Sequence, residues 1–415
     1  MPKRIAVIHK DKCNPQGCGG YLCIKVCPVN KGGEECVFVA DDKKAGISEP
    51  LCIGCLICVH KCPYGAISII NLPEEWNKSP LHRYGENKFS LYSMPTPFMS
   101  KVTGVLGRNG IGKSTAIKIL AQVIKPNLRE WDKEAQTQDI LKYFRGTEAQ
   151  IFFQLLNEGK ISVSYKPQNV ELIPRKAQGS VESLLRKVDA KNIEKSKRSD
   201  FDKVIEQLEL KKIFNNDITK ISGGELQRVA IAAALLKDAN LYIFDEPTSF
   251  LDIKQRIKVS RVIRELVNSG DKNKNDNTAV LLVEHDLLIL DYMTEMVYLM
   301  YGEESVYGVV SLPKATRTGI NTYLSGYLKD ENIRFRDKTI KFEAKPPVAL
   351  KRNEALVKWK AISKQLGNFK LKAPEGEIYR NQVIGVLGEN GIGKTSFVKI
   401  LAGVLELDQG EIDRK

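Results

Sequence analysis

A glycine-rich loop that occurs twice is the feature that most constrains the fold of this chain. Residues 104–120 read GVLGRNGIGKSTAIKIL, and residues 385–401 read GVLGENGIGKTSFVKIL. Around the first copy, an apolar stretch precedes the loop and an amphipathic stretch follows it, which predicts a strand, a loop and a helix. In such a loop the glycines let backbone N–H groups point at a phosphate, and the helix N-terminus adds partial positive charge. The repeat predicts two nucleotide-binding domains of the α/β class.

Each loop carries a lysine and a hydroxyl residue for the phosphates. Lys113 is expected to reach the β- and γ-phosphates and Ser114 to ligate magnesium, and Lys394 and Thr395 take these roles in the second loop. The residues predicted to bind nucleotide in the two loops are Gly107, Asn109, Gly110, Gly112, Lys113, Ser114 and Thr115, and then Gly388, Asn390, Gly391, Gly393, Lys394, Thr395 and Ser396.

Two apolar segments end in residues suited to phosphate chemistry. Residues 241–244 predict a buried parallel strand that delivers Asp245 and Glu246 to the phosphate face. Asp245 can hold magnesium through water, and Glu246 can polarise the attacking water. A second strand, predicted over 278–283, ends at His285, the one histidine of four at a predicted strand end, and a γ-phosphate contact is expected for it.

Residues 221–228 read ISGGELQR and resemble the signature of ATP-binding-cassette proteins. Other cassette elements match in order: residues 166–168 resemble the Q-loop, residues 249–252 the D-loop, and His285 the switch histidine. The resemblance implies that Glu246, His285 and Gln168 are catalytic, and that Gln168 also contacts magnesium. It implies that the signature residues Ser222, Gly223, Gly224 and Glu225 bind a γ-phosphate held by an opposite domain. The residues placed where cassette proteins stack adenine are Tyr84, Phe89 and, in the second half, Phe369.

All nine cysteines fall before residue 63, in two sets that each end in Cys-Pro. One set follows the bacterial ferredoxin spacing C-x2-C-x2-C-x3-C, whose fourth cysteine ligates the other of two clusters. The spacing predicts two 4Fe-4S clusters, one held by Cys13, Cys18, Cys23 and Cys62, the other by Cys52, Cys55, Cys58 and Cys27. Zinc is the alternative metal. Cys36 is left over and is expected to be a small buried apolar residue. The clusters could carry electrons or staple a small domain.

The 64 basic and 50 acidic residues give a formal charge of +14. Two clusters would bring this to about +10, which favours a polyanionic partner, although a well-solvated basic protein explains it equally. We find neither an apolar run long enough to cross a bilayer nor a signal peptide, so a cytoplasmic protein without a membrane partner is expected.

Two cassettes behind two ferredoxin-like motifs resemble the RNase L inhibitor family, the ribosome-recycling ATPases of archaea and eukaryotes. The resemblance implies a ferredoxin-like α+β domain over 1–75, a first cassette over 80–310, a basic hinge over 311–340 and the start of a second cassette over 341–415. An insertion at 128–160 would be a helix–loop–helix that contacts the small ribosomal subunit, with Thr147 and Gln150 as a capping box. An ordinary packed helical hairpin is the alternative. The hinge could bind ribosomal RNA, or be a solvated linker.

The function implied by the resemblance is ATP-driven ribosome splitting, in which cassette closure swings the cluster domain, with a release-factor-like protein as a further partner. The alternatives are an ATP-coupled electron-transfer protein, a transporter ATPase subunit and a binding scaffold. The second cassette stops soon after its phosphate loop, so we expect this chain to bind ATP but to turn it over poorly.

Overall fold

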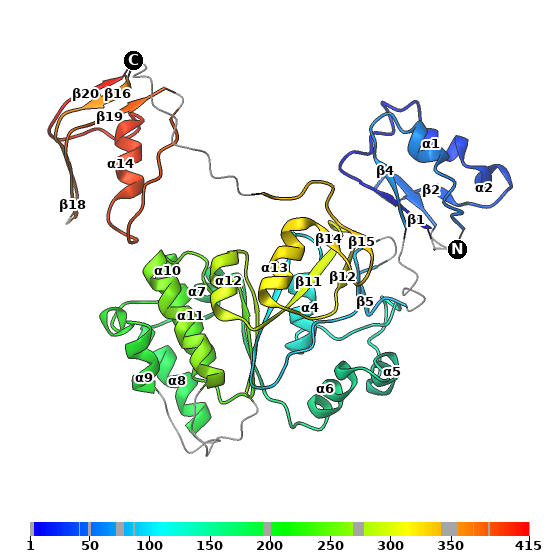
Figure 1. Ribbon diagram of the computed structural model, residues 1–415, viewed down its shortest axis with the longest axis horizontal. Coiled ribbons are helices and arrows are strands. Elements are labelled where there is room, and N and C mark those ends of the chain that lie inside the picture. The colour runs from blue at the N-terminus through cyan, green and yellow to red at the C-terminus, as the bar shows by residue number, and fades with distance from the viewer. Residues whose placement is uncertain are drawn as a thin grey trace.

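The computed structural model describes residues 4–40, 42–48, 51–71, 79–85, 88–193, 201–268, 278–341, 355–367, 369–380 and 382–414. Figure 1 shows an N-terminal unit, a large central unit and a small C-terminal unit. The segment 73–80, which its sequence PEEWNKSP predicts to be a linker, lies largely outside the described residues, and so does the start of the second cassette at 342–354. Within the described residues, no helix is both long and apolar enough for a membrane span.

The N-terminal unit is built from two small antiparallel sheets and three short helices. Strand β1 (Arg4–Ile8) pairs with β4 (Ile67–Asn71), and β2 (Val37–Val39) pairs with β3 (Ala45–Ile47). Helices α1 (Leu22–Val26), α2 (Pro28–Lys31) and α3 (Ile57–Lys61) each lie beside a cysteine set. The small core comprises Val37, Ile47 and Ile67 together with three of the cysteines.

A nine-stranded sheet forms the centre of the large unit. Its order is β5 (His82–Arg83), β6 (Ser90–Tyr92), β12 (Tyr307–Val310), β11 (Met296–Glu303), β7 (Val102–Gly107), β10 (Ala279–Val283), β9 (Leu241–Asp245) and β8 (Val163–Lys166), with β13 (Lys314–Ala315) on β11. The strands β7, β8, β9 and β10 run parallel. Every residue of β7, β9 and β10 is buried, as expected for parallel strands at the centre of a sheet. The bounds of these strands agree with the apolar runs in the sequence to within one residue, so the predicted strands are confirmed.

Helices cover both faces of this sheet (Figure 1). One core cluster joins Phe244 and Leu282 to α10 (Gly223–Leu235), and the other joins Ile243 and Leu281 to α4 (Lys113–Leu120). The remaining helices of the unit are α5 (Thr137–Tyr143), α6 (Glu148–Asn157), α7 (Ile173–Lys176), α8 (Val181–Ile193), α9 (Phe201–Gln207), α11 (Ile253–Asn268) and α12 (Leu287–Met293), with short 3-10 helices at Val170–Leu172 and Lys211–Ile213. The α/β class predicted for the cassette is confirmed.

The insertion folds as the predicted pair of helices, α5 and α6, and packs into the core. The apolar pattern of the second helix predicts that Ile151 and Phe152 are buried. Phe152 is buried, but Ile151 is 61% exposed and Phe153 is buried in its place. The predicted capping box is wrong. Thr147 Oγ1 donates to the carbonyl of Phe144, and the Gln150 side chain accepts from the N–H of Gly146, so the two side chains close the preceding turn.

The segment predicted as a hinge is folded. It contains β13, α13 (Thr316–Ser325), β14 (Tyr327–Leu328) and β15 (Ile333–Arg334), and α13 packs against β11. Lys314 is buried and pairs with Asp330 and Glu331. The guanidinium of Arg336 lies over the ring of Tyr323, 4.7 Å from its centroid. These two side chains therefore stabilise the segment, whereas the Arg317 side chain is 89% exposed and lies 3.9 Å from the Asp291 carboxylate.

The C-terminal unit repeats the start of the cassette. It comprises β16 (Ala355–Trp359), β17 (Ile362–Leu366), β18 (Phe369–Ala373), β19 (Gly376–Tyr379), α14 (Lys394–Leu401) and β20 (Ile412–Arg414). Residues 382–389 form no strand, and Val383 and Leu387 are 99% and 81% exposed. In the first cassette the matching strand, β7, is hydrogen-bonded to β10 on one side and β11 on the other. No described strand lies beside 382–389, so its apolar side chains face solvent.

One turn connects the N-terminal unit to the first phosphate loop. Between β11 and β12, the Ser305 N–H donates to the carbonyl of Gly110 at 3.0 Å. Glu303, at the start of the same turn, lies 3.7 Å from the His9 ring nitrogen. His9 follows β1, and its ring also lies 3.2 Å from the Ser68 hydroxyl of β4.

Candidate nucleotide and cluster sites

The two phosphate loops have the same local geometry. Gly112 and Gly393, at the N-cap positions of α4 and α14, have φ values of 88° and 90°, which glycine adopts without strain. Lys113 Nζ donates to the carbonyls of Gly107 and Arg108 at 2.8 and 2.7 Å. Lys394 Nζ donates to the matching pair of carbonyls at 2.7 and 2.6 Å. Each loop thus encircles an ammonium group, which a bound phosphate can pair with.

An aromatic ring supports each loop from behind. A Cβ atom on Gly112 would lie 2.4 Å from Phe89 Cζ, and one on Gly393 would lie 2.9 Å from Phe369 Cζ. Both rings contact the backbone of their loop. Tyr84 is 47% exposed, and its hydroxyl lies 3.1 Å from the hydroxyl of Thr115, another predicted site residue. Of the three predicted rings, Tyr84 is therefore the one most open to a base.

Asp245 fits the expected metal-binding role. It ends β9, is 1% exposed, and receives a hydrogen bond from the side chain of Ser114. Its Oδ1 atom is buried without a donor among the described residues. Burial and the neighbouring Glu246 raise the pKa of Asp245. A buried carboxylate oxygen beside a serine hydroxyl is a suitable setting for Mg²⁺ and its waters.

Three side chains converge on the Glu246 carboxylate. Gln168 Nε2 donates to Oε1 at 2.7 Å, Ser249 Oγ donates to Oε2 at 3.0 Å, and His285 Nε2 lies 3.4 Å from Oε1. The predicted catalytic residues Glu246, Gln168 and His285 are thus brought together, although they come from three separate strand ends. Such a carboxylate can accept a proton from a water placed against the γ-phosphate.

Two functional candidates escaped the sequence reasoning. Glu284 is 4% exposed, and its carboxylate accepts from the N–H and hydroxyl of Thr248 and from the N–H of His285. It therefore anchors the loops after β9 and β10 to each other. Lys166 is buried behind Glu246. Their signals in the sequence are that Lys166 is the first residue of the predicted Q-loop and that Glu284 directly precedes His285.

The signature begins a helix, which is a setting suited to binding an anion. Ser222 is the N-cap of α10, and its side chain and that of Glu225 form a reciprocal capping box. Beside it lies the second phosphate loop. Asn390 Nδ2 donates to the carbonyl of Phe250 at 2.9 Å, its N–H donates to Asp252 at 3.2 Å, and Lys254 pairs with Glu389 at 3.0 Å. The second loop thus faces the D-loop and signature of the first cassette.

The affinity of the first loop for ATP is expected to depend on pH. Burial lowers the pKa of Lys113 to about 8, although Glu246 and Asp245 act in the opposite direction. The ammonium is present below this pKa and is lost as pH rises through it, so phosphate binding should be unaffected below pH 7 and weaken above pH 8.

We predict that the Kd for ATP at the first loop is about tenfold higher at pH 9 than at pH 7. With a pKa of about 8, most Lys113 side chains are charged at pH 7 and only about one in ten at pH 9. Titration of a Lys394→Ala variant with a fluorescent ATP analogue isolates the first loop. A flat profile from pH 7 to 9 would contradict the prediction.

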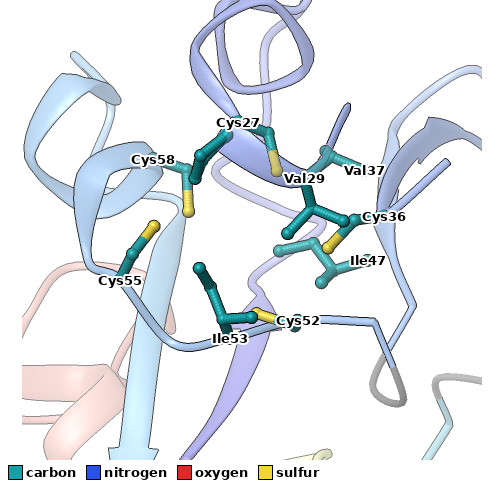
Figure 2. A pocket seen from close by; sticks show the side chains of 10 residues that line it. Cys27, Val29, Cys36, Val37, Ile47, Cys52, Ile53, Cys55 and Cys58 are labelled. Atoms are coloured by element: carbon teal, nitrogen blue, oxygen red, sulfur yellow. The ribbon is translucent and has the colours of Figure 1, made fainter. Parts of the chain in front are cut away.

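The cysteines line two separate cavities in the N-terminal unit. One is lined by Cys13, Cys18, Cys23 and Cys62, and the other by Cys27, Cys52, Cys55 and Cys58. These are the two predicted sets, each with one cysteine contributed by the opposite half of the unit. Figure 2 shows the sulfur atoms of the second set pointing toward one another. Among the described residues, no three metal-ligating side chains are close enough to hold a single ion.

Cys36 lies against the second cavity. It is 1% exposed, as expected for a small apolar residue, but its side chain is also close to Cys27 and Cys52 (Figure 2). Burial, followed by the charges of these two neighbours, raises the pKa of the Cys36 thiol to about 12.

Family models match most of this architecture. The model for ABC transporters matches residues 98–249 and 371–415. A model for a possible Fer4-like domain in RNase L inhibitor matches residues 4–35, and a 4Fe-4S binding domain matches residues 45–68. The iron–sulfur character of the N-terminal unit is therefore shown, in preference to zinc.

Two of the similar proteins described here match over nearly the whole chain, and a third matches a shorter part. An uncharacterized ABC transporter ATP-binding protein of Methanocaldococcus jannaschii is 47% identical, over 99% of this chain and 65% of its own length. Translation initiation factor RLI1 of Saccharomyces cerevisiae is 43% identical, over 98% of this chain and 66% of its own length. ABC transporter E family member 3 of Arabidopsis thaliana is 35% identical over 40% of this chain, which covers 79% of that relative.

One solved structure matches this chain with a TM-score of 0.86 and 48% sequence identity. The match covers 99% of this chain and 66% of the chain in that structure. The structure is described as ribosome-bound archaeal Pelota and ABCE1. This chain spans about 65% of the length of the curated relatives that it matches from end to end.

Proposed function

Since the chain belongs to the RNase L inhibitor family of ATP-binding-cassette proteins, we propose that it acts in the ATP-driven separation of ribosomal subunits. The observation that carries this proposal is the position of the second phosphate loop. Asn390 is hydrogen-bonded to Phe250 and Asp252, beside the signature helix of the first cassette. A nucleotide held there would touch both lobes, so its binding and loss would change how the lobes sit together.

The first cassette supplies the groups for hydrolysis. Lys113 would bind the β- and γ-phosphates, and Ser114 and Asp245 would hold Mg²⁺, which would polarise the γ-phosphoryl group. Glu246 orients the attacking water and accepts its proton. Gln168 and His285 keep the Glu246 carboxylate directed at that water through the contacts described above. The signature residues, Ser222 to Glu225, would bind the γ-phosphate held by the second loop, so loss of that phosphate would weaken the contact between the two lobes.

Two 4Fe-4S clusters are the cofactors that the N-terminal unit would hold. Cys13, Cys18, Cys23 and Cys62 surround one cavity, and Cys27, Cys52, Cys55 and Cys58 surround the other. The unit's own apolar core is small, so bound clusters would supply much of its rigidity. A rigid unit can transmit cassette motion to a ribosomal surface.

The partners that we propose are the small ribosomal subunit with its RNA and a release-factor-like protein, in the cytoplasm. The basic surplus of the chain favours an RNA partner, because Lys and Arg bind phosphates without regard to sequence. The insertion, α5 and α6, and the exposed Arg317 of α13 are candidate contacts.

Co-sedimentation with small ribosomal subunits tests this proposal. We expect the chain to pellet with the subunits in the presence of a non-hydrolysable ATP analogue, and to be recovered at a several-fold lower level without nucleotide. The Lys113→Ala, Lys394→Ala double variant should lose the nucleotide effect. Absence of binding under both conditions, together with nucleotide-linked reduction of the iron centres, would favour the electron-transfer alternative.

A further inference from the structure

Lys166 is a buried cation with no part in the mechanism described so far. It is the last residue of β8 and is 1% exposed, which places it among the largest fully buried side chains of the described chain. Its Nζ atom donates to the carbonyl of Asp245 at 2.9 Å and to the carbonyl of Glu246 at 3.2 Å. A buried ammonium group lowers stability unless it is paired, so its presence here calls for a specific role.

The sheet register explains how Lys166 reaches these carbonyls. β8 runs parallel to β9, and Lys166 is paired with Phe244, one residue before Asp245. Its side chain extends past the end of β9, under the turn that carries the acidic pair. Asp245, Glu246 and Glu284 all contribute negative charge at this point, and Lys166 is the buried cation that faces all three.

The backbone of Glu246 needs this support. Its φ is 49°, in the left-handed region that glutamate rarely adopts. Such a conformation persists where the surroundings hold it in place. Here the Glu246 carbonyl accepts from both Lys166 and Gln227, the latter at 2.7 Å, and the Glu246 N–H donates to Val283 at 3.0 Å. The peptide on which the carboxylate is mounted is therefore fixed at each polar atom.

We propose that Lys166 is a positioning residue for Glu246, holding the left-handed turn so that the carboxylate meets Gln168, Ser249 and His285. This inference rests on the proposed ATP hydrolysis. Lys166 contacts neither the phosphate loop nor the signature in the described structure, so it acts on the rate of hydrolysis and not on the affinity for ATP.

A double-mutant cycle with Glu246 tests the proposal. Lys166→Met, Glu246→Gln and the double variant are compared in single-turnover hydrolysis with protein in excess over ATP. We expect Lys166→Met to slow hydrolysis by about 10- to 100-fold, with the Kd for a fluorescent ATP analogue changed by less than about twofold. The double variant should be no slower than Glu246→Gln alone, because a residue that acts through Glu246 has no effect once Glu246 is disabled.

Lys314→Met is the matched control. Lys314 is also a buried lysine, but its partners are Asp330 and Glu331, away from the phosphate loops. It should lower the Tm without changing the single-turnover rate. Should Lys166→Met fail to fold, Lys166→Leu replaces it, since leucine also removes the donor to both carbonyls and still fills part of the buried space.

Multiplicative slowing in the double variant, or an unchanged rate in a folded Lys166 variant, would overturn the inference and leave the proposed function standing. A wild-type chain that binds ATP and never hydrolyses it would overturn both.

Discussion

Glu246→Gln is expected to leave ATP bound and to slow hydrolysis by about 10²- to 10⁴-fold, the range associated with losing a general base. The amide keeps the size of the carboxylate. Its oxygen can still accept from Gln168, and its NH2 group can donate to the Ser249 hydroxyl, so the turn should remain intact. It cannot take a proton from water. The defect should therefore fall on the rate of the chemical step, with the Kd for ATP within about twofold of wild type.

Single-turnover hydrolysis and fluorescent-nucleotide binding, measured side by side, check this result. Glu206→Gln is a suitable control, because Glu206 is an exposed residue of α9. A Glu246→Gln variant that retains the wild-type rate would exclude Glu246 as the base. A variant that loses ATP binding would show instead that this side chain serves to hold the nucleotide.

Cys58→Ala is expected to remove one of the two clusters and to destabilise the N-terminal unit. Cys58 is buried and lines the cavity with Cys27, Cys52 and Cys55. Two complete clusters contain about eight iron atoms per chain, so the variant should retain about four. Few apolar side chains form the core of this unit, so loss of a cluster should destabilise it strongly. The unfolding transition of the N-terminal unit should therefore move to a lower temperature, by more than the transition of the first cassette moves when one of its buried residues is replaced by alanine.

Cys36→Ala is the control for this experiment. Cys36 lines the same cavity and is as deeply buried, but it is outside both ferredoxin sets. Iron and sulfide analysis of anaerobically purified protein should give the wild-type content for this variant. Loss of iron from Cys36→Ala, with retention in Cys58→Ala, would mean that the ligand assignment of the second cavity is wrong.

The parts of the site that lie in short continuous motifs could be predicted from sequence. The phosphate loops, the acidic pair after β9 and the signature helix are fixed by local chemistry: glycines, an apolar strand and an N-cap serine. The two cysteine sets belong to the same class, because ferredoxin spacing dictates that one ligand crosses to the other cluster.

Features that depend on packing could not be predicted. Lys166 and Glu284 are charged residues whose burial is decided by neighbouring strands, and no periodicity marks them. Ile151 is apolar yet exposed, because Phe153 occupies the buried side of α6. Lys314 lies in the segment that the sequence predicts to be a basic hinge, but its ammonium group is buried and paired with Asp330 and Glu331. Phe89 and Phe369 support their loops from behind, a role that a motif for adenine stacking does not describe.

The turn between β11 and β12 contacts both the N-terminal unit and the first phosphate loop. Ser305 is bonded to Gly110, within the loop that must tighten around phosphate, and Glu303 meets His9 on the N-terminal unit. Residues 303–305 thus contact the N-terminal unit through Glu303 and the first phosphate loop through Ser305. If phosphate binding moves Gly110, these contacts are the route by which that movement would reach His9, so the N-terminal unit would respond to the first loop without contacting ATP itself.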